Sequence, residues 1–294
     1  MSFSLLATSL INGLLLGGVY SLTAVGLTLI FGVMGTANFA HGTFLMAGVY
    51  IAYWLFKLVG IDPYISLFVA MGAMFLYGWF VQKYLVSKIM GGPHYYTFLL
   101  SIGIMIFMES TALFLWPDYR QLLLSYTTKG INVSRGLQIH TVRLLAFLIA
   151  FALTFALYYF IKLTEIGKAI RATSQNKTAA LMVGINVEKI YCITFAIGSA
   201  CAGAAGAVIA PFYPATYNIG DIFLLVAFVV VCLGGMGNLI GSMIGGLIIG
   251  VAESFGTLII PGGQKQLITF AIFIAILFFK PQGLLRFGGY WQAQ

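Results

Sequence analysis

The sequence predicts an all-α protein, a polytopic transmembrane helical bundle. Hydrophobic residues make up 61% of its 294 residues, charged residues only 7%, and the mean hydropathy is +1.02. Soluble domains are about 25% charged, so this chain lacks the charge to cover a surface in water. Its apolar runs are about 20 residues long without strand-like alternation, and in lipid such runs satisfy their backbone polar groups as helices.

About eight or nine membrane spans are expected, because nine apolar segments follow one another along the chain. They cover residues 9–31, 38–58, 63–82, 96–116, 143–162, 190–210, 220–235, 239–257 and 266–279. The last segment is short for a span and is expected to be tilted or extended. We interpret residues 1–294 as a single transmembrane domain.

Basic residues predict the orientation of the bundle, since cytoplasmic loops carry an excess of Lys and Arg. With the loop 162–189 in the cytoplasm, nine basic residues lie inside: Lys83, Lys88, Lys162, Lys168, Arg171, Lys177, Lys189, Lys280 and Arg286. Six lie outside: Lys57, Arg120, Lys129, Arg135, Arg143 and Lys265. Nine spans then place the C-terminus inside and the N-terminus outside, whereas a re-entrant element within residues 9–58 would reverse the N-terminus. The net charge of +8 suits this role rather than nucleic-acid binding.

The longest polar interval, residues 162–189, lies between two apolar segments and carries five basic and two acidic residues. Within it Ser174 can cap a short helix and Gly184 can end it. Ala179 and Ala180 give that helix a small, smooth surface of the kind that a docking helix presents to a groove. The residues alone leave two interpretations open, a docking helix or a solvated amphipathic turn.

Glycine is abundant, with 35 residues, and its spacing predicts close helix packing. Gly13, Gly17 and Gly18 lie on one side of the first segment, and Gly237 and Gly241 have the G-x-x-x-G spacing. Small residues let membrane helices approach closely. The alternative is a helix broken near the middle of the membrane, which exposes backbone groups to a substrate.

Polar residues interrupt the apolar pattern near one such glycine-rich stretch. Asn38 and His41 lie between two apolar spans, and residues 235–238 weakly repeat the pattern of residues 32–38. Because polar groups inside a membrane are costly and usually functional, we predict that Asn38 and His41 lie near a translocation path or gate. A packing role is the alternative.

Glu109 is the clearest isolated anomaly, since it lies deep in the segment 96–116. A carboxylate there must face a cavity, pair with a cation or bind a proton, and we expect it to be buried and paired. With Glu253 it could form a proton relay, or each acid could be satisfied locally. The sequence contains no catalytic triad, P-loop, zinc-protease motif or Cys/His cluster, so we predict no catalytic residue, no metal site, no cofactor and no enzyme activity.

The chain resembles the permease subunits of branched-chain amino-acid ABC importers, the LivH/LivM family, and is more similar to LivH. The matching stretches are residues 11–50, 166–208, 234–250 and 279–285. The most specific parts are the NFAHG stretch and the loop pattern R-A-x-S-x-(N/D)-x(3)-A-x-x-x-G-I.

The resemblance implies a multi-pass permease in the bacterial inner (cytoplasmic) membrane, surrounded by lipid. It further implies a second permease subunit, two cytoplasmic ATPases that hydrolyse ATP, and a periplasmic or extracellular substrate-binding protein. Residues 163–189 would form a cytoplasmic coupling loop in which Arg171, Ala179, Ala180 and Gly184 match the ATPase-docking motif, although Thr178 replaces the glutamate of that motif. The implied substrates are leucine, isoleucine and valine, and some relatives carry urea or short amides. A proton-coupled secondary transporter and a structural membrane subunit are the alternatives.

Overall fold

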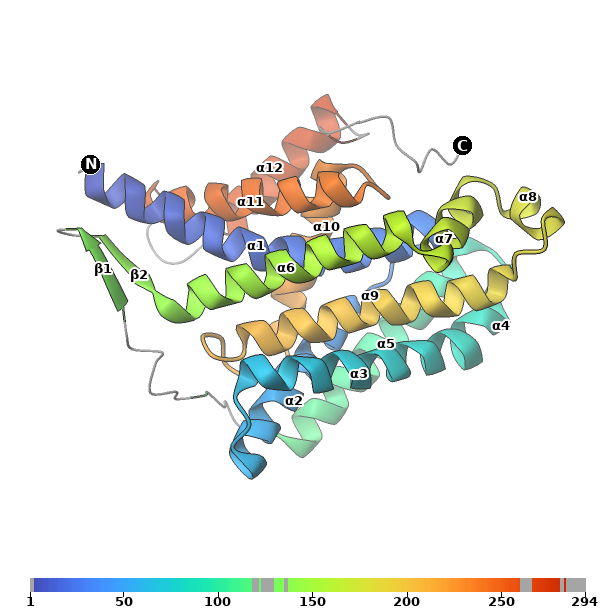
Figure 1. The fold of residues 1–294 in the computed structure, drawn as a ribbon, viewed down its shortest axis with the longest axis horizontal. Helices are drawn as coiled ribbons and strands as arrows, with labels where there is room; N and C mark the ends of the chain where they lie inside the picture. The colour runs from blue at the N-terminus through green and yellow to red at the C-terminus, as the bar shows by residue number, and fades with distance from the viewer. Residues whose placement is uncertain are drawn as a thin grey trace.

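The structure, a computed structural model, describes residues 3–117, 122, 130–134, 137–259, 266–280 and 283. It confirms the helical bundle, because every predicted apolar segment forms a helix in the described part of the chain (Figure 1). These helices are α1 (Phe3–Met34), α2 (His41–Val59), α3 (Pro63–Val81), α5 (His94–Leu115), α6 (Thr141–Leu163), α9 (Val187–Ile209), α10 (Ile219–Gly234), α11 (Leu239–Ile259) and α12 (Gln266–Phe279). Seven are long and apolar enough to cross a membrane, whereas α10 and α12 have only 16 and 14 residues.

Several short elements join these helices. The π-helical turn η1 (Gln82–Val86) and α4 (Ser87–Ile89) continue α3, and α7 (Glu165–Gln175) and α8 (Lys177–Met182) form within the polar interval. The strands β1 (Gly130–Ser134) and β2 (Leu137–His140) pair as an antiparallel hairpin just before α6. This hairpin is an addition to the predicted all-α architecture.

The two ends of the bundle differ in the elements that they carry. Figure 1 shows α4, α7 and α8 at one end of the long axis, and the N-terminus with β1 and β2 at the other. The N-terminus therefore lies opposite the polar interval, as the alternation of nine segments predicts. Five of the basic residues used to predict the orientation lie outside the described residues: Arg120, Lys129, Arg135, Lys265 and Arg286.

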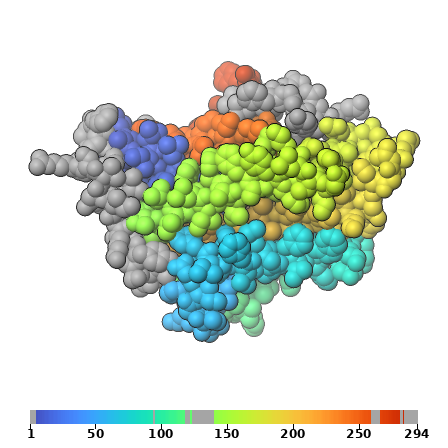
Figure 2. Space-filling model, viewed as in Figure 1, coloured from blue at the N-terminus to red at the C-terminus, as the bar shows by residue number. Residues whose placement is uncertain are grey.

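Helices α1 and α9 form the centre of the bundle, and most of their side chains are buried. In the space-filling view of Figure 2, α6 crosses the visible face from end to end, and α1 emerges mainly near its N-terminal end. The outer helices α3, α5 and α12 instead expose many large apolar side chains. Such exposure is what a chain surrounded by hydrocarbon requires.

Glycines bring α1 and α11 into backbone contact. A Cβ atom added to Gly13 would lie 2.7 Å from the Cα of Val251, and one added to Gly17 would lie 2.8 Å from the Cα of Leu247. Only a residue without a side chain permits this approach. The predicted packing role is confirmed for these two glycines, while Gly18 faces α6 instead.

The chain also contains two helix breaks of similar design. Residues 35–40 separate α1 from α2, and residues 235–238 separate α10 from α11. Each break begins with a glycine in the left-handed region, Gly35 with φ +66° and Gly235 with φ +91°, a conformation that side chains disfavour. The weak repeat in the sequence therefore corresponds to a glycine of positive φ at the start of each break, although the second break is shorter and contains a further such glycine, Gly237.

Candidate functional site

The polar interval folds as two short helices. Asn176 begins α8 by accepting a hydrogen bond from the backbone N–H of Ala179 at 2.9 Å. Ser174, which we predicted as a helix cap, instead donates to a backbone carbonyl within α7. That prediction was wrong because Asn176 carries the extended backbone of a cap residue, and asparagine is a strong capping residue. Gly184 follows the end of α8 with φ +83°, as predicted.

The end of α8 exposes three consecutive apolar side chains. Leu181, Met182 and Val183 are 53%, 82% and 75% exposed. They lie beyond the ends of α6 and α9, where α8 projects from the bundle (Figure 1). Exposed apolar clusters of this kind mark interaction surfaces. We refer to residues 181–183 as the α8 tip.

The four residues predicted for the coupling loop have different surroundings. Ala179 and Gly184 are exposed beside the α8 tip, whereas Ala180 is buried. Arg171 is half-buried and donates from Nη1 to two backbone carbonyls at the end of α6, at 2.5 and 3.1 Å. Arg171 therefore ties α7 to α6 by satisfying carbonyls that have no partner within the helix. Only Ala179 and Gly184 extend the surface of the α8 tip.

Asn38 and His41 meet at the break between α1 and α2. The Asn38 Oδ1 accepts a hydrogen bond from the backbone N–H of Ala40 at 3.1 Å. His41 has no exposed surface, and its Nε2 donates to the backbone carbonyl of Thr23 at 3.0 Å. The void beside Asn38 measures only about 10 Å³, so both residues lie in a packed junction in this conformation.

Each of these two side chains also has an unsatisfied polar atom. The Asn38 Nδ2 and the His41 Nδ1 are buried without a hydrogen-bond partner among the described residues. Buried polar atoms are nearly always paired in folded proteins. The junction therefore carries polar groups that could gain a partner when the helices move.

Glu109 on α5 has a second carboxyl group, that of Asp221 in the first turn of α10, as its charged neighbour. The Glu109 side chain is partly exposed, although its Oε1 is buried without a hydrogen-bond partner in the described structure. Our prediction that Glu109 is buried and paired holds only in part, because the side chain is partly exposed and its partner is not a cation but a second carboxyl group, within side-chain hydrogen-bonding reach. Sequence reasoning missed Asp221, since α5 and α10 are far apart along the chain.

Glu253 has different partners from Glu109. Its side chain is 1% exposed, its Oε2 accepts from the Tyr20 hydroxyl at 2.7 Å, and its Oε1 accepts from the Thr269 hydroxyl at 2.5 Å. These bonds join α11 to α1 and α12. The two acids that we considered as a relay therefore belong to separate networks.

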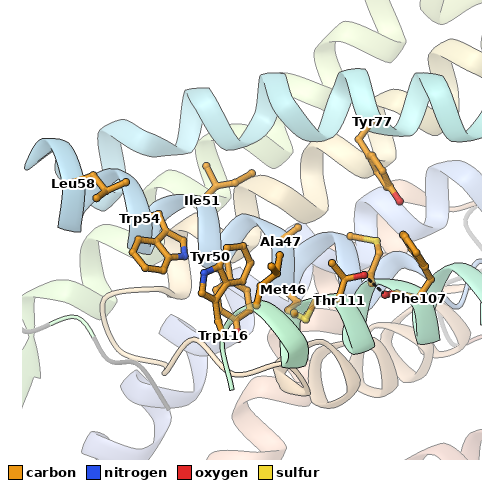
Figure 3. Close-up of a pocket in the computed structure, with 13 residues that line it drawn as sticks. Met46, Ala47, Tyr50, Ile51, Trp54, Leu58, Tyr77, Phe107, Thr111 and Trp116 are labelled. Atoms are coloured by element: carbon orange, nitrogen blue, oxygen red, sulfur yellow. Dashed lines mark hydrogen bonds between the residues drawn. The ribbon is translucent and has the colours of Figure 1, made fainter. Parts of the chain in front are cut away.

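A large apolar cavity of about 680 Å³ lies between α2, α3 and α5. In Figure 3, Tyr50, Trp54 and Trp116 gather toward one end of it, and Tyr77 and Phe107 lie toward the other. The rings of Tyr50 and Trp116 stack with centroids 4.9 Å apart. Sequence reasoning missed this cavity, because aromatic residues occur throughout the chain and no local pattern marks those that converge.

Comparisons with known proteins find relatives along nearly the whole chain. The sequence model of a family described as "Branched-chain amino acid transport system / permease component" matches residues 9–277. The high-affinity branched-chain amino acid transport system permease protein BraD of Pseudomonas aeruginosa is 32% identical over 94% of this chain and 94% of its own length. The permease protein LivH of the corresponding system in Escherichia coli (strain K12) is 31% identical over 93% of each chain.

A more distant similarity covers a smaller part of the chain. The ribose import permease protein RbsC of Haemophilus influenzae is 30% identical over 40% of this chain and 39% of its own length. No solved structure matches the chain.

Proposed function

Because this chain belongs to the family of branched-chain amino acid transport system permease components, we propose that it is the permease subunit of an ABC importer that carries leucine, isoleucine and valine. The proposed substrates rest on one observation: about one third of the residues are identical to those of BraD and LivH over nearly the full length of the chain. The ribose permease matches less than half of the chain, which favours an amino acid over a sugar.

In this proposal the chain spans the bacterial inner membrane and works in a complex. It pairs with a second permease subunit, identical or related, and two cytoplasmic ATPases bind the end that carries α7 and α8. A periplasmic or extracellular binding protein delivers the substrate to the opposite end. ATP hydrolysis belongs to the ATPases, since this sequence has no P-loop.

The α8 tip supports the docking of an ATPase. The tip carries three exposed apolar side chains on a basic loop. Their removal from water by a groove of the partner would stabilise the complex. Ala179 and Gly184 leave room for close approach beside the tip, and Ala180 packs inward. Arg171 fastens α7 to the end of α6, so a displacement of the docked loop would move a membrane helix and change access to the path.

The helix breaks and their polar residues support a path or gate at the junction between α1 and α2. Transporters bind substrates where broken helices expose backbone and side-chain groups. Asn38 and His41 lie at one break with unsatisfied buried atoms, and Glu109 faces Asp221. We assign Asn38, His41 and Glu109 to the path or gate in this proposal.

The first experiment is co-purification of the chain with candidate ATPases from its own genome, followed by uptake of labelled leucine into vesicles with the binding protein. Met182→Glu should release the ATPase and reduce uptake about 30-fold or more, as expected for a residue central to an interface. Lys88→Gln changes the charge by the same amount on α4, at the same end of the bundle but outside the coupling loop, and should retain both the bound ATPase and leucine uptake. Ala180→Glu should also release the ATPase, but with a lower thermal stability, because Ala180 is buried.

The alternatives give different results in the same assay. Leucine uptake by the chain alone, driven by a proton gradient and lost in Glu109→Gln, would establish a secondary transporter instead. Absence of uptake with every ATPase would favour a structural subunit. Competition by urea, a short amide or ribose, but not by isoleucine or valine, would overturn the proposed substrate class.

A further inference from the structure

A polar cavity of about 260 Å³ lies apart from the helix breaks and from the α8 tip. Its wall comes from α1, the start of α6, the connection between α9 and α10, and the second half of α11. The N-terminus of α1 and the hairpin that precedes α6 lie at the same end of the bundle (Figure 1). In the orientation that we predict, this is the outer end.

Charged side chains of opposite sign line this cavity. Arg143 on α6 is half-buried, and its Nη1 donates to the Asn12 Oδ1 at 3.4 Å. A guanidinium remains charged in proteins. On the α11 side, Glu253 is oriented by the hydroxyl groups of Tyr20 and Thr269. The cavity is therefore lined by a half-buried cation and, from another helix, by a buried carboxyl group whose two oxygens also accept hydrogen bonds from hydroxyl groups.

The remaining wall is mixed. Leu16 on α1 and Phe212 and Tyr213 after α9 contribute apolar surface, while Asn12 and Thr257 contribute polar groups. Pockets for drug-sized ligands occupy roughly 300–1,000 Å³, so a cavity of about 260 Å³ suits a smaller solute. A solute with a carboxylate, an ammonium group and a short apolar side chain matches all three kinds of wall.

We propose that this cavity binds a zwitterionic α-amino acid, with its carboxylate on Arg143 and its ammonium group on Glu253. The charged groups define the class of ligand, and the choice of leucine as the probe rests on the proposed function. The membrane subunit then receives substrate at its outer end before the path opens toward the α8 tip.

Two other roles make different predictions. A purely structural Glu253 would hold α1, α11 and α12 together, and ligands would have no effect on the protein. The head group of a zwitterionic lipid shares an ammonium group and an anion with an amino acid. The assay therefore uses the assembled transporter, purified without its binding protein, in nanodiscs that contain only phosphatidylglycerol.

Thermal unfolding of that complex is followed with rising concentrations of L-leucine, isoamylamine or 4-methylpentanoate. Ligands that bind the folded state raise the unfolding temperature by an amount that grows with the logarithm of the ratio of ligand concentration to Kd. L-Leucine should raise it, whereas the amine, which lacks the carboxylate, and the acid, which lacks the ammonium group, should not do so at equal concentration. Equal shifts with all three compounds, or no shift with leucine, would overturn the proposal. A shift that is produced by adding phosphatidylethanolamine and not by leucine would assign the cavity to lipid.

Substitutions locate the effect in this cavity. Arg143→Gln should weaken leucine binding about tenfold or more, because it removes a charge-assisted hydrogen bond, and Arg143→Lys should restore part of it. Lys57→Gln removes an exposed cation at the end of α2 and serves as the control. Glu253→Gln should abolish the shift if the variant folds. Because Glu253 also joins three helices, Arg143→Gln decides the proposal, and unchanged leucine binding in that variant would contradict it.

The results also separate this site from the proposed function. Normal leucine uptake together with no leucine-dependent shift would overturn the site and leave the importer intact. Absence of leucine uptake by the unmodified complex would instead overturn the importer that carries branched-chain amino acids.

Discussion

At the residue scale, three polar residues with a similar sequence context have different environments. Asn38, His41 and Glu109 all interrupt apolar segments. His41 is fully buried and bonded to the backbone of α1, whereas Glu109 is partly exposed beside Asp221. The structure therefore separates a side chain that packs a helix junction from one that meets a second carboxyl group.

His41→Ala should destabilise the folded protein. The substitution leaves a cavity at the junction and removes a buried hydrogen bond, so we expect the free energy of unfolding to fall by about 2–3 kcal/mol. Thermal unfolding in one detergent measures it. His140→Ala is the control, because His140 is exposed and surface substitutions usually change stability by less than about 0.5 kcal/mol. Equal unfolding temperatures for the two variants would show that the junction is loosely packed.

At the element scale, glycine has two separate uses in this chain. In α1 and α11 it lets two helices touch, and in residues 35–40 and 235–238 it opens a break between helices. The spacing of glycines in the sequence suggested both helix packing and helix breaks, but it did not show which glycine has which role. Which glycines pack and which ones break a helix depends on the partner helix and on the backbone angle φ.

Gly17→Ala should weaken the contact between α1 and α11. The new Cβ would lie 2.8 Å from the backbone of Leu247, which cannot move aside as a flexible side chain can, so we expect a loss of about 1–3 kcal/mol. Gly72→Ala is the matched control, because a Cβ there meets nothing within 4 Å. It should be neutral or stabilising, since alanine favours helix by about 1 kcal/mol over glycine. A Gly17→Ala variant as stable as Gly72→Ala would rule out the close contact.

Gly184→Pro should uncouple the ATPase from transport. Proline fixes φ near −65°, whereas Gly184 has φ +83°, so the end of α8 must be rebuilt and the α8 tip displaced. We expect ATP hydrolysis to continue while leucine uptake falls. Gly184→Asn is the conservative variant, because asparagine tolerates the left-handed region, and it should keep both activities. Fully coupled uptake in Gly184→Pro would remove this loop from the coupling mechanism.

At the scale of the whole molecule, the bundle has two distinct ends. One carries the α8 tip and a cluster of basic residues, and the other carries the hairpin and the cavity that contains Arg143 and Glu253. In the proposed importer, ATPases act at the end that carries the α8 tip and substrate arrives at the opposite end, so the two ends need different structures.

Cysteine labelling tests this orientation. A membrane-impermeant maleimide should modify His140→Cys in intact cells and Met182→Cys only after the membrane is permeabilised, since both positions are exposed at opposite ends. The unmodified protein is the control, because Cys192 and Cys201 are buried and Cys232 is half-buried. Labelling of Met182→Cys in intact cells would invert the orientation and place the α8 tip outside.

The sequence by itself determined the nine apolar helices and the polar interval, because hydropathy and segment length are properties of neighbouring positions in the chain. Only the tertiary structure decided that Ala180 packs inward while the α8 tip is exposed, and that Asn176 rather than Ser174 begins α8. It alone brought Asp221 to Glu109, and Arg143 and Glu253 to one cavity. Such pairs join helices that are far apart in sequence. Every face of a membrane helix is apolar enough to meet either lipid or another helix, so composition does not specify which faces pack together.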